Sequence, residues 1–102
     1  MERYEVFIKP AAKEDLREIF RYITEILNEP NIAERICDTI ETAILTLSRL
    51  PLRHGVSAEE PFTSRGIRKM PVKNYAVFYN VDDSGVHILR IIHSRRKWQS
   101  LV

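Results

Sequence analysis

At 102 residues with 44% hydrophobic content, the chain is long enough for one domain with a single core and too short for two. Its one cysteine, Cys37, excludes an internal disulfide and any metal site built from several cysteines, and a lone thiol fits a reducing cytoplasm. The charged segment Met1–Glu5 lacks the apolar core of a signal peptide, and no apolar run is long enough to cross a bilayer, so we expect a cytoplasmic protein.

Charge is unevenly distributed along the chain, although the net charge is only +2. Residues 1–67 contain nine Lys and Arg against twelve Asp and Glu, whereas residues 68–102 contain seven against two. A basic C-terminal third suits the binding of RNA or of an acidic protein segment. The plainer alternative is a solvated basic face with no partner.

The first half of the chain predicts one strand and two helices. Apolar and polar residues alternate over Tyr4–Ile8, as in a partly buried strand. From Ala11 to Asn28 apolar residues recur every three or four positions, which predicts an amphipathic helix. A second apolar stripe runs from Ile32 to Leu47 and ends near Pro51, and Asn31 with Glu34 is spaced as a capping box for that helix.

The second half predicts a loop followed by a sheet. The segment Pro51–Gly66 is rich in Pro, Gly, Ser and Glu and is long enough to have a function of its own. Three strands are expected after it, the last two joined by the turn Asp82–Gly85: Ile67–Val72, Asn74–Val81 and Val86–His93. The predicted fold class is α+β, with an N-terminal strand, a helical hairpin and antiparallel strands in one twisted sheet.

Short motifs in a fixed order cover essentially the whole chain. They are Tyr4-x-Val6-x-Ile8-x-Pro10-Ala11, Asp15-Leu16-x-x-Ile19-x-x-Tyr22-Ile23, Ile67-Arg68-Lys69, Asn74-Tyr75-x-Val77-Phe78-Tyr79 and Ile88-Leu89-Arg90-Ile91-Ile92-His93-x-Arg95-Arg96-x-Trp98. This set resembles the RelE/ParE superfamily of bacterial toxins.

The resemblance implies a single toxin domain over residues 1–102, acting in a type II toxin–antitoxin, or plasmid stabilisation, system. It implies a cytoplasmic protein without a cofactor, neutralised by a cognate antitoxin, and either a homodimer or a toxin–antitoxin hetero-oligomer. Two targets are found among its members. RelE-like toxins cut mRNA in the ribosomal A site, and ParE-like toxins poison DNA gyrase without a nuclease step.

A nuclease of this kind needs a base, an acid and cations around the scissile phosphate. Glu60 resembles the general base of YoeB-like members, His93 is the candidate acid, and Arg68 is the catalytic cation. Target binding is assigned to basic and aromatic residues of the last third, namely Lys69, Lys73, Arg90, Arg95, Arg96 and Trp98.

Structural roles compete with these assignments. Glu60 can be a solvated loop residue, His93 can simply end a strand, and Trp98 can cover the core. Arg90 lies inside an apolar strand, where an ion pair with a helix carboxylate is as reasonable as contact with a target.

The sequence departs from the nuclease pattern at the middle strand of the predicted sheet. Many RelE-like nucleases have an arginine at the position of Ala76. They also tend to end in a segment with a catalytic tyrosine or paired basic residues, and no tyrosine follows Tyr79. The gyrase-poison hypothesis is therefore slightly favoured over an mRNA endoribonuclease. A member that binds an antitoxin without being toxic is the third hypothesis.

Overall fold

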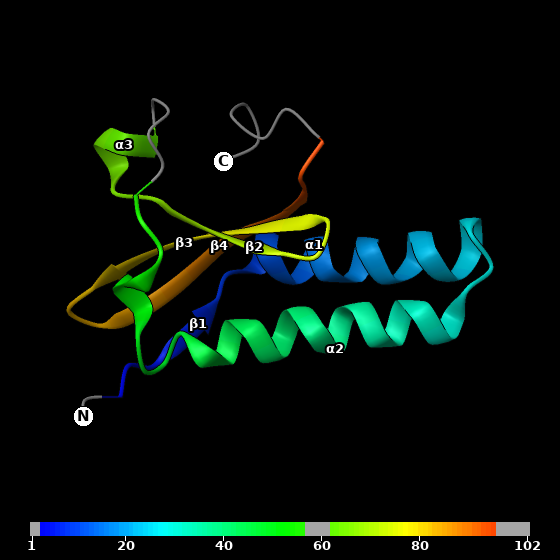
Figure 1. Ribbon diagram of the computed structural model, residues 1–102, viewed down its shortest axis with the longest axis horizontal. Coiled ribbons are helices and arrows are strands. Elements are labelled where there is room, and N and C mark those ends of the chain that lie inside the picture. Colours follow the sequence, from blue (N-terminus) through cyan, green and yellow to red (C-terminus); the bar gives the residue numbers. More distant parts are fainter. Residues whose placement is uncertain (1–2, 57–61, 96–102) are drawn as a thin grey trace.

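The computed structural model describes residues 3–56 and 62–95 and has a helical hairpin packed on one face of a four-stranded sheet (Figure 1). The predicted α+β class is confirmed. The strands are β1 (Val6–Ile8), β2 (Arg68–Val72), β3 (Tyr75–Asp82) and β4 (Gly85–His93), and their order in the sheet is β1-β4-β3-β2.

The sheet is mixed, because β1 runs parallel to β4 while β2, β3 and β4 are antiparallel to one another. The parallel pair is short and joins Val6 to Val86 and Ile8 to Ile88. Gly85 permits it, since a Cβ at this position would collide with the Glu5 carbonyl. The direction of β1 relative to the other strands was not predicted from the sequence. The chain passes through the helical hairpin, β2 and β3 before β4 returns alongside β1.

The helical hairpin consists of α1 (Pro10–Arg21), a π-helical turn η1 (Tyr22–Ile26) and α2 (Pro30–Thr46). The first helix thus changes its hydrogen-bonding pattern after Arg21 and ends before Asn28, which adopts a left-handed φ of 55°. The predicted capping box is wrong. Pro30 occupies the first turn of α2, where its fixed φ and missing N–H are tolerated, so Asn31 is already inside the helix.

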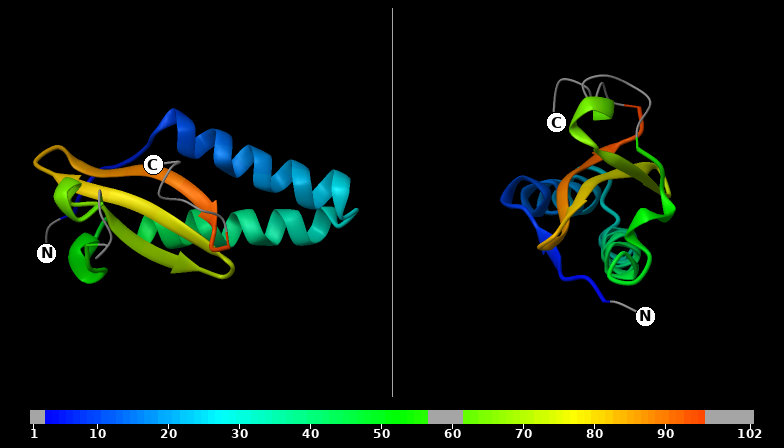
Figure 2. Two further views of the ribbon diagram at one scale, coloured as in Figure 1. Left: turned by 90° about the horizontal axis from the view of Figure 1, so that it is seen from above. Right: turned by 90° about the vertical axis from the view of Figure 1, so that its left-hand side faces the viewer.

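The main core lies between the hairpin and the sheet. Its largest fully buried members come from α2 and from the facing sides of β3 and β4, and include Ile40, Ile44, Val77, Tyr79 and Ile88. A smaller cluster on the other face of the sheet joins Ile67, Ala76, Phe78 and Ile92. Figure 2 shows the helices on one side of the sheet and α3 (Phe62–Arg65) on the other.

The segment predicted as a loop contains α3 and a turn of 3-10 helix, η2 (Pro51–Arg53). The buried Tyr79 hydroxyl donates to the Pro51 carbonyl at 2.6 Å, which fixes η2 against the sheet. Among the described residues, no helix has the length and apolar character needed to span a membrane.

Candidate functional site

The site is built where α1 passes the last residues of β4. The Asp15 carboxylate accepts two hydrogen bonds from the Arg90 guanidinium, at 2.7 Å from Nε and 2.8 Å from Nη2, and a third from the Ile91 backbone N–H at 2.9 Å. Both side chains are largely buried, with exposed fractions of 14% for Asp15 and 22% for Arg90. The ion pair raises the pKa of Arg90, so its guanidinium stays charged.

This contact exists because β1 is too short to accompany β4 to its end. Pro10 starts α1 directly after the Lys9 amide has bonded the Ile88 carbonyl, so within residues 3–56 and 62–95 β4 has no strand partner on that side beyond Ile88. A bulge in the β3–β4 pairing makes Leu89 an extra residue and re-aims Arg90 toward the open edge. The Asp15 carboxylate then bonds the Ile91 amide, which would otherwise lack a partner.

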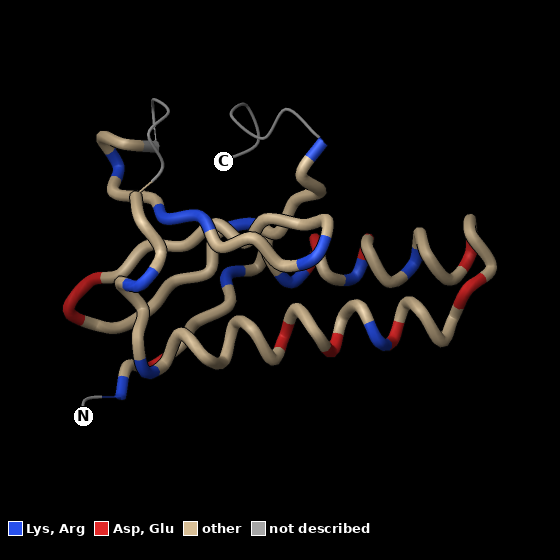
Figure 3. The backbone as a smooth tube through the Cα atoms, in the orientation of Figure 1, with Lys and Arg blue, Asp and Glu red and all other residues tan. Residues whose placement is uncertain are grey.

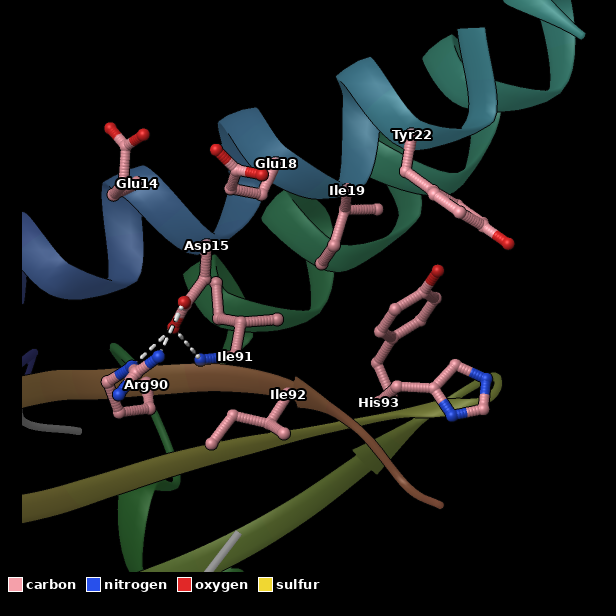
Figure 4. Close-up of a pocket in the computed structure, with 10 residues that line it drawn as sticks. Glu14, Asp15, Glu18, Ile19, Tyr22, Arg90, Ile91, Ile92 and His93 are labelled. Carbon is pink, nitrogen blue, oxygen red and sulfur yellow. Dashed lines mark hydrogen bonds and ion pairs between the residues drawn. The ribbon is translucent and has the colours of Figure 1, made fainter. Parts of the chain in front are cut away.

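A groove of about 680 Å³ lies between α1 and this part of β4 (Figure 4). Asp15, Ile19 and Tyr22 project from the helix side toward β4. The full lining comprises Glu14, Asp15, Glu18, Ile19, Tyr22, Tyr75, Arg90, Ile91, Ile92 and His93.

Tyr75 and His93 close one end of the groove. Their rings pack edge to face with centroids 5.3 Å apart, and the two residues are direct partners in the β3–β4 register. Burial raises the pKa of the Tyr75 phenol, so it remains neutral and cannot act as a base near pH 7. His93 Nδ1 accepts the Arg95 backbone N–H at 3.2 Å, so this ring nitrogen already has a partner.

Basic residues lie along β2 and next to the end of β4, while the helical hairpin carries most of the acidic residues (Figure 3). Lys73 and Arg95 are exposed at one end of the sheet, where the Ser94 amide bonds the Asn74 carbonyl and so brings the two turns together. We call these two residues the basic end. Arg68 lies at the opposite end of β2 and donates from Nη1 to the His54 carbonyl at 2.6 Å.

No ion site is evident in the part of the chain that the structure describes, since nowhere in it do three or more His, Cys, Asp or Glu side chains gather as metal ligands would. The β3–β4 hairpin does hold one polar cluster, in which Asp82 Oδ1 accepts the Ser84 N–H and hydroxyl and lies 2.9 Å from His87 Nε2. These bonds lower the pKa of Asp82 well below its usual range. The Ser84 N–H, the Ser84 hydroxyl and His87 Nε2 all contact the same Asp82 oxygen. This is the arrangement of a turn and not of a relay from serine to histidine to carboxylate.

Comparison with known families decides the identity of this fold. The model described as the ParE toxin of the type II toxin–antitoxin system, parDE, matches residues 6–98. The chain belongs to the ParE toxin family. It is therefore the toxin of a type II toxin–antitoxin system, and the predicted membership of the RelE/ParE superfamily is confirmed.

Two solved structures resemble this ParE-family toxin. A chain of the chromosomal ParDE system from P. aeruginosa superimposes with a TM-score of 0.75 over 89% of this chain and 96% of that one, at 19% identity, which shows a shared fold. A chain of the RelBE2 toxin–antitoxin complex from Mycobacterium tuberculosis gives a TM-score of 0.61 over 89% and 98%, at 28% identity. Among curated protein sequences, none matches this toxin.

In the structure, the candidate nuclease residues Arg68 and His93 lie far apart. Arg68 pairs with Tyr79 and His93 pairs with Tyr75, so they are separated by four residues of β3, about 13 Å along the sheet, and by two strand spacings across it. Lys69 is partly buried opposite Phe78. Glu60, Arg96 and Trp98 lie outside the described residues.

The groove residues on α1 are the part of this site that sequence reasoning missed. From the sequence, Asp15 belongs to the polar face of the first helix and has no assigned role, and Tyr22 has none either. One signal was present, because a lone arginine within an apolar strand needs a buried partner. Only the fold identifies which of the seven carboxylates of α1, η1 and α2 supplies it.

Proposed function

We propose that this toxin poisons DNA gyrase in the cytoplasm and does not cleave RNA. The basic end binds the target, together with the basic and aromatic tail that follows Arg95 in the sequence. A cognate antitoxin neutralises it, in keeping with the two structural neighbours, which come from toxin–antitoxin systems.

The observation that carries this proposal is the wide separation of Arg68 and His93. Cleavage of RNA needs the proton-transfer group and the charge-stabilising cation within hydrogen-bonding reach of one phosphate. Here Arg68 is bonded to the His54 carbonyl, and Arg90 is bonded to Asp15.

The position of Ala76 supports the same reading. Its side chain is 1% exposed between Pro71 of β2 and Ile92 of β4, in the smaller apolar cluster. An arginine could not be accommodated there without a large rearrangement, so the cation that many RelE-like nucleases carry has no place in this sheet.

Controlled expression in a bacterial host tests the proposal, with an SOS reporter and mRNA 5′ ends measured in the same cultures. We expect SOS induction with intact messages. The double variant Lys73→Glu with Arg95→Glu should reduce induction by about tenfold, because it reverses both charges of the basic end. Arg17→Ala is the matched control, since it removes an exposed cation from α1, away from the sheet.

Two other outcomes would replace the proposal. Messages cut in phase with ribosomes, with cutting lost in His93→Ala, would make the toxin an endoribonuclease. A folded protein that leaves growth unchanged at the same expression level would make it an antitoxin-binding module without toxicity.

A further inference from the structure

Two segments of the chain that contain no acidic residue meet beside β2. They are residues 42–56, at the end of α2 and in η2, and residues 62–81, in α3, β2 and most of β3. Val56 forms an antiparallel bridge with Arg68, and the Tyr79 hydroxyl holds the Pro51 carbonyl. The first segment belongs to the net acidic part of the sequence, so charge counted along the chain does not reveal this junction.

Arg53 and Arg68 come together at the junction, and we call them the arginine pair. Arg68 donates from Nη1 to the His54 carbonyl at 2.6 Å, and Arg53 donates from Nε to Nε2 of the same histidine at 3.3 Å. Arg53 also donates from Nη2 to the Thr46 hydroxyl. Burial raises the pKa of Tyr79, and the charges of both arginines oppose this effect. Both guanidinium groups therefore lie near the same phenol.

The positive charge of the arginine pair is not neutralised by any residue that the structure describes. The ion pairs within residues 3–56 and 62–95 involve other cations. Burial, together with the Arg53 charge, lowers the pKa of His54, so its ring is neutral near pH 7 and adds no charge. A guanidinium has five N–H donors, more than these bonds use. Two like charges held together without a described counter-ion indicate that an external anion binds there.

The arginine pair and the basic end, Lys73 and Arg95, lie at the two ends of β2. This strand is an edge of the sheet, and Lys73 follows Arg68 by five positions, or about 17 Å along an extended chain. Arg53, Lys73 and Arg95 are exposed, and Arg68 is half-buried. Basic residues thus mark both ends of this side of the sheet (Figure 3). We call the line from the arginine pair to the basic end the basic track.

The length of the basic track fits a nucleic-acid backbone. A strand of B-form DNA has one phosphate about every 3.4 Å, so the track matches about five phosphates of one strand. Guanidinium groups bind phosphate oxygens through paired N–H donors. An acidic protein segment is the competing ligand, because Leu50 and Leu52 are exposed next to Arg53 in the sequence. Evenly spaced charges favour the phosphate backbone, since it can meet both ends of the track at once.

We propose that the basic track binds the phosphate backbone of double-stranded DNA, with one strand running along β2. The inference rests on the proposed action on DNA gyrase, whose substrate is DNA, and it adds a direct contact between the toxin and that DNA. Contacts to phosphates carry no sequence information, so duplexes of different sequence should bind equally well.

The test measures binding of the full-length toxin to a fluorescent DNA duplex of about 20 base pairs, at several salt concentrations between about 50 and 200 mM. The logarithm of the association constant should fall linearly with the logarithm of the salt concentration. Each lost phosphate contact should reduce the magnitude of the slope by about 0.9. We expect this reduction in Arg53→Gln and in Lys73→Gln, and about 1.8 in the double variant, because the two ends bind phosphates of the same duplex.

Matched variants separate charge from other effects. Arg53→Lys keeps the charge at the same exposed position and should keep the slope of the parent. Arg17→Gln removes an exposed cation from α1, outside the basic track, and should also keep it. Arg68→Gln should behave as Arg53→Gln does, and circular dichroism checks its fold because Arg68 also bonds the His54 carbonyl.

Three results would overturn the proposal. The first is no binding of the duplex at about 50 mM salt, or a slope that Arg53→Gln leaves unchanged. The second is tighter binding of single-stranded RNA than of the duplex, with the same changes in slope, which would assign the track to RNA. The third is tighter binding of polyglutamate than of the duplex, lost in Arg53→Gln, which would assign it to an acidic protein.

The SOS reporter keeps this inference distinct from the proposed function. If the toxin induces the SOS response but Arg53→Gln binds DNA as the parent does, the basic track fails and the action on gyrase stands. If the toxin cuts messages without SOS induction but the slopes change as described, the DNA-binding surface stands and the proposed target fails.

Discussion

The two halves of β4 differ in what lies on their outer side. From Val86 to Ile88 the strand has β1 on one side and β3 on the other, and both named residues are fully buried. From Arg90 to His93 it pairs with β3 on one side, and on the other side, in the part of the chain that the structure describes, it meets the side chains of α1. Among the described residues, the first half is therefore paired with a strand on both sides, and the second half with a strand on one side.

The second half is protected without being closed. An open strand edge favours unwanted pairing, and proteins limit this with short edges and with charges placed at them. Asp15 has this effect in two ways. It accepts the hydrogen bond of the Ile91 amide, and it holds the charged Arg90 guanidinium at the start of this edge. Arg17–Glu14 and Arg21–Glu18 on the same helix have equally short contacts of 2.6 Å, but their side chains are at least half exposed.

The largest effect is expected in the first half of β4. Ile88→Ala removes a fully buried side chain from the centre of the main core and should lower the free energy of unfolding by about 2–5 kcal/mol. Urea denaturation followed by circular dichroism measures it. A loss below about 1 kcal/mol would mean that the β1–β4 region is less tightly packed than described.

Asp15→Ala should have the next largest effect, about 2–3 kcal/mol, because it leaves the Arg90 guanidinium and the Ile91 amide without this partner. Glu14→Ala, which breaks an exposed pair on the same helix, should cost no more than about 0.5 kcal/mol. Chemical denaturation of both variants gives the comparison. Equal losses would show that the largely buried pair contributes no more than a surface pair.

The hairpin before the first half should respond to pH. The folded-state pKa of Asp82 lies below its ordinary value of 3.8, so its stabilising bonds are fully present above that pH and are lost as the pH falls below it. Asp82→Asn should therefore lose less stability than the parent when the pH is lowered from 5 to 2, as thermal melts would show. Parallel pH profiles for the two proteins would contradict the role given to Asp82.

The smallest effect is expected at the turn next to the open half. Lys73 adopts a left-handed φ of 55°, which disfavours any residue with a Cβ, so Lys73→Gly should stabilise the fold by about 0.5 kcal/mol. A rise in the melting temperature checks this. Lys73→Ala, which removes the same charge and keeps the Cβ, is the control and should not produce the gain.

Hydrophobic periodicity was sufficient to predict the helical hairpin and the three antiparallel strands, because each element buries one face and its sequence repeats with the period of that face. It did not predict the turn of π-helix after Arg21 or the start of α2 at Pro30, since local backbone geometry at helix ends depends on a few residues. Of the candidate site, the sequence indicated that Arg90 needs a partner or a target. The choice of Asp15 depends on contact between residues 75 positions apart.

By itself, the sequence determined the fold class, the family and the basic character of the last third, because these follow from residue types and their spacing. The tertiary structure alone decided that β1 stops at Ile8 beside β4, that Asp15 meets Arg90 there, and that Arg68 and His93 are separated by four residues along the sheet and two strands across it. Strand length and register place side chains and free backbone groups in space, and neither is encoded in the pattern of any single segment.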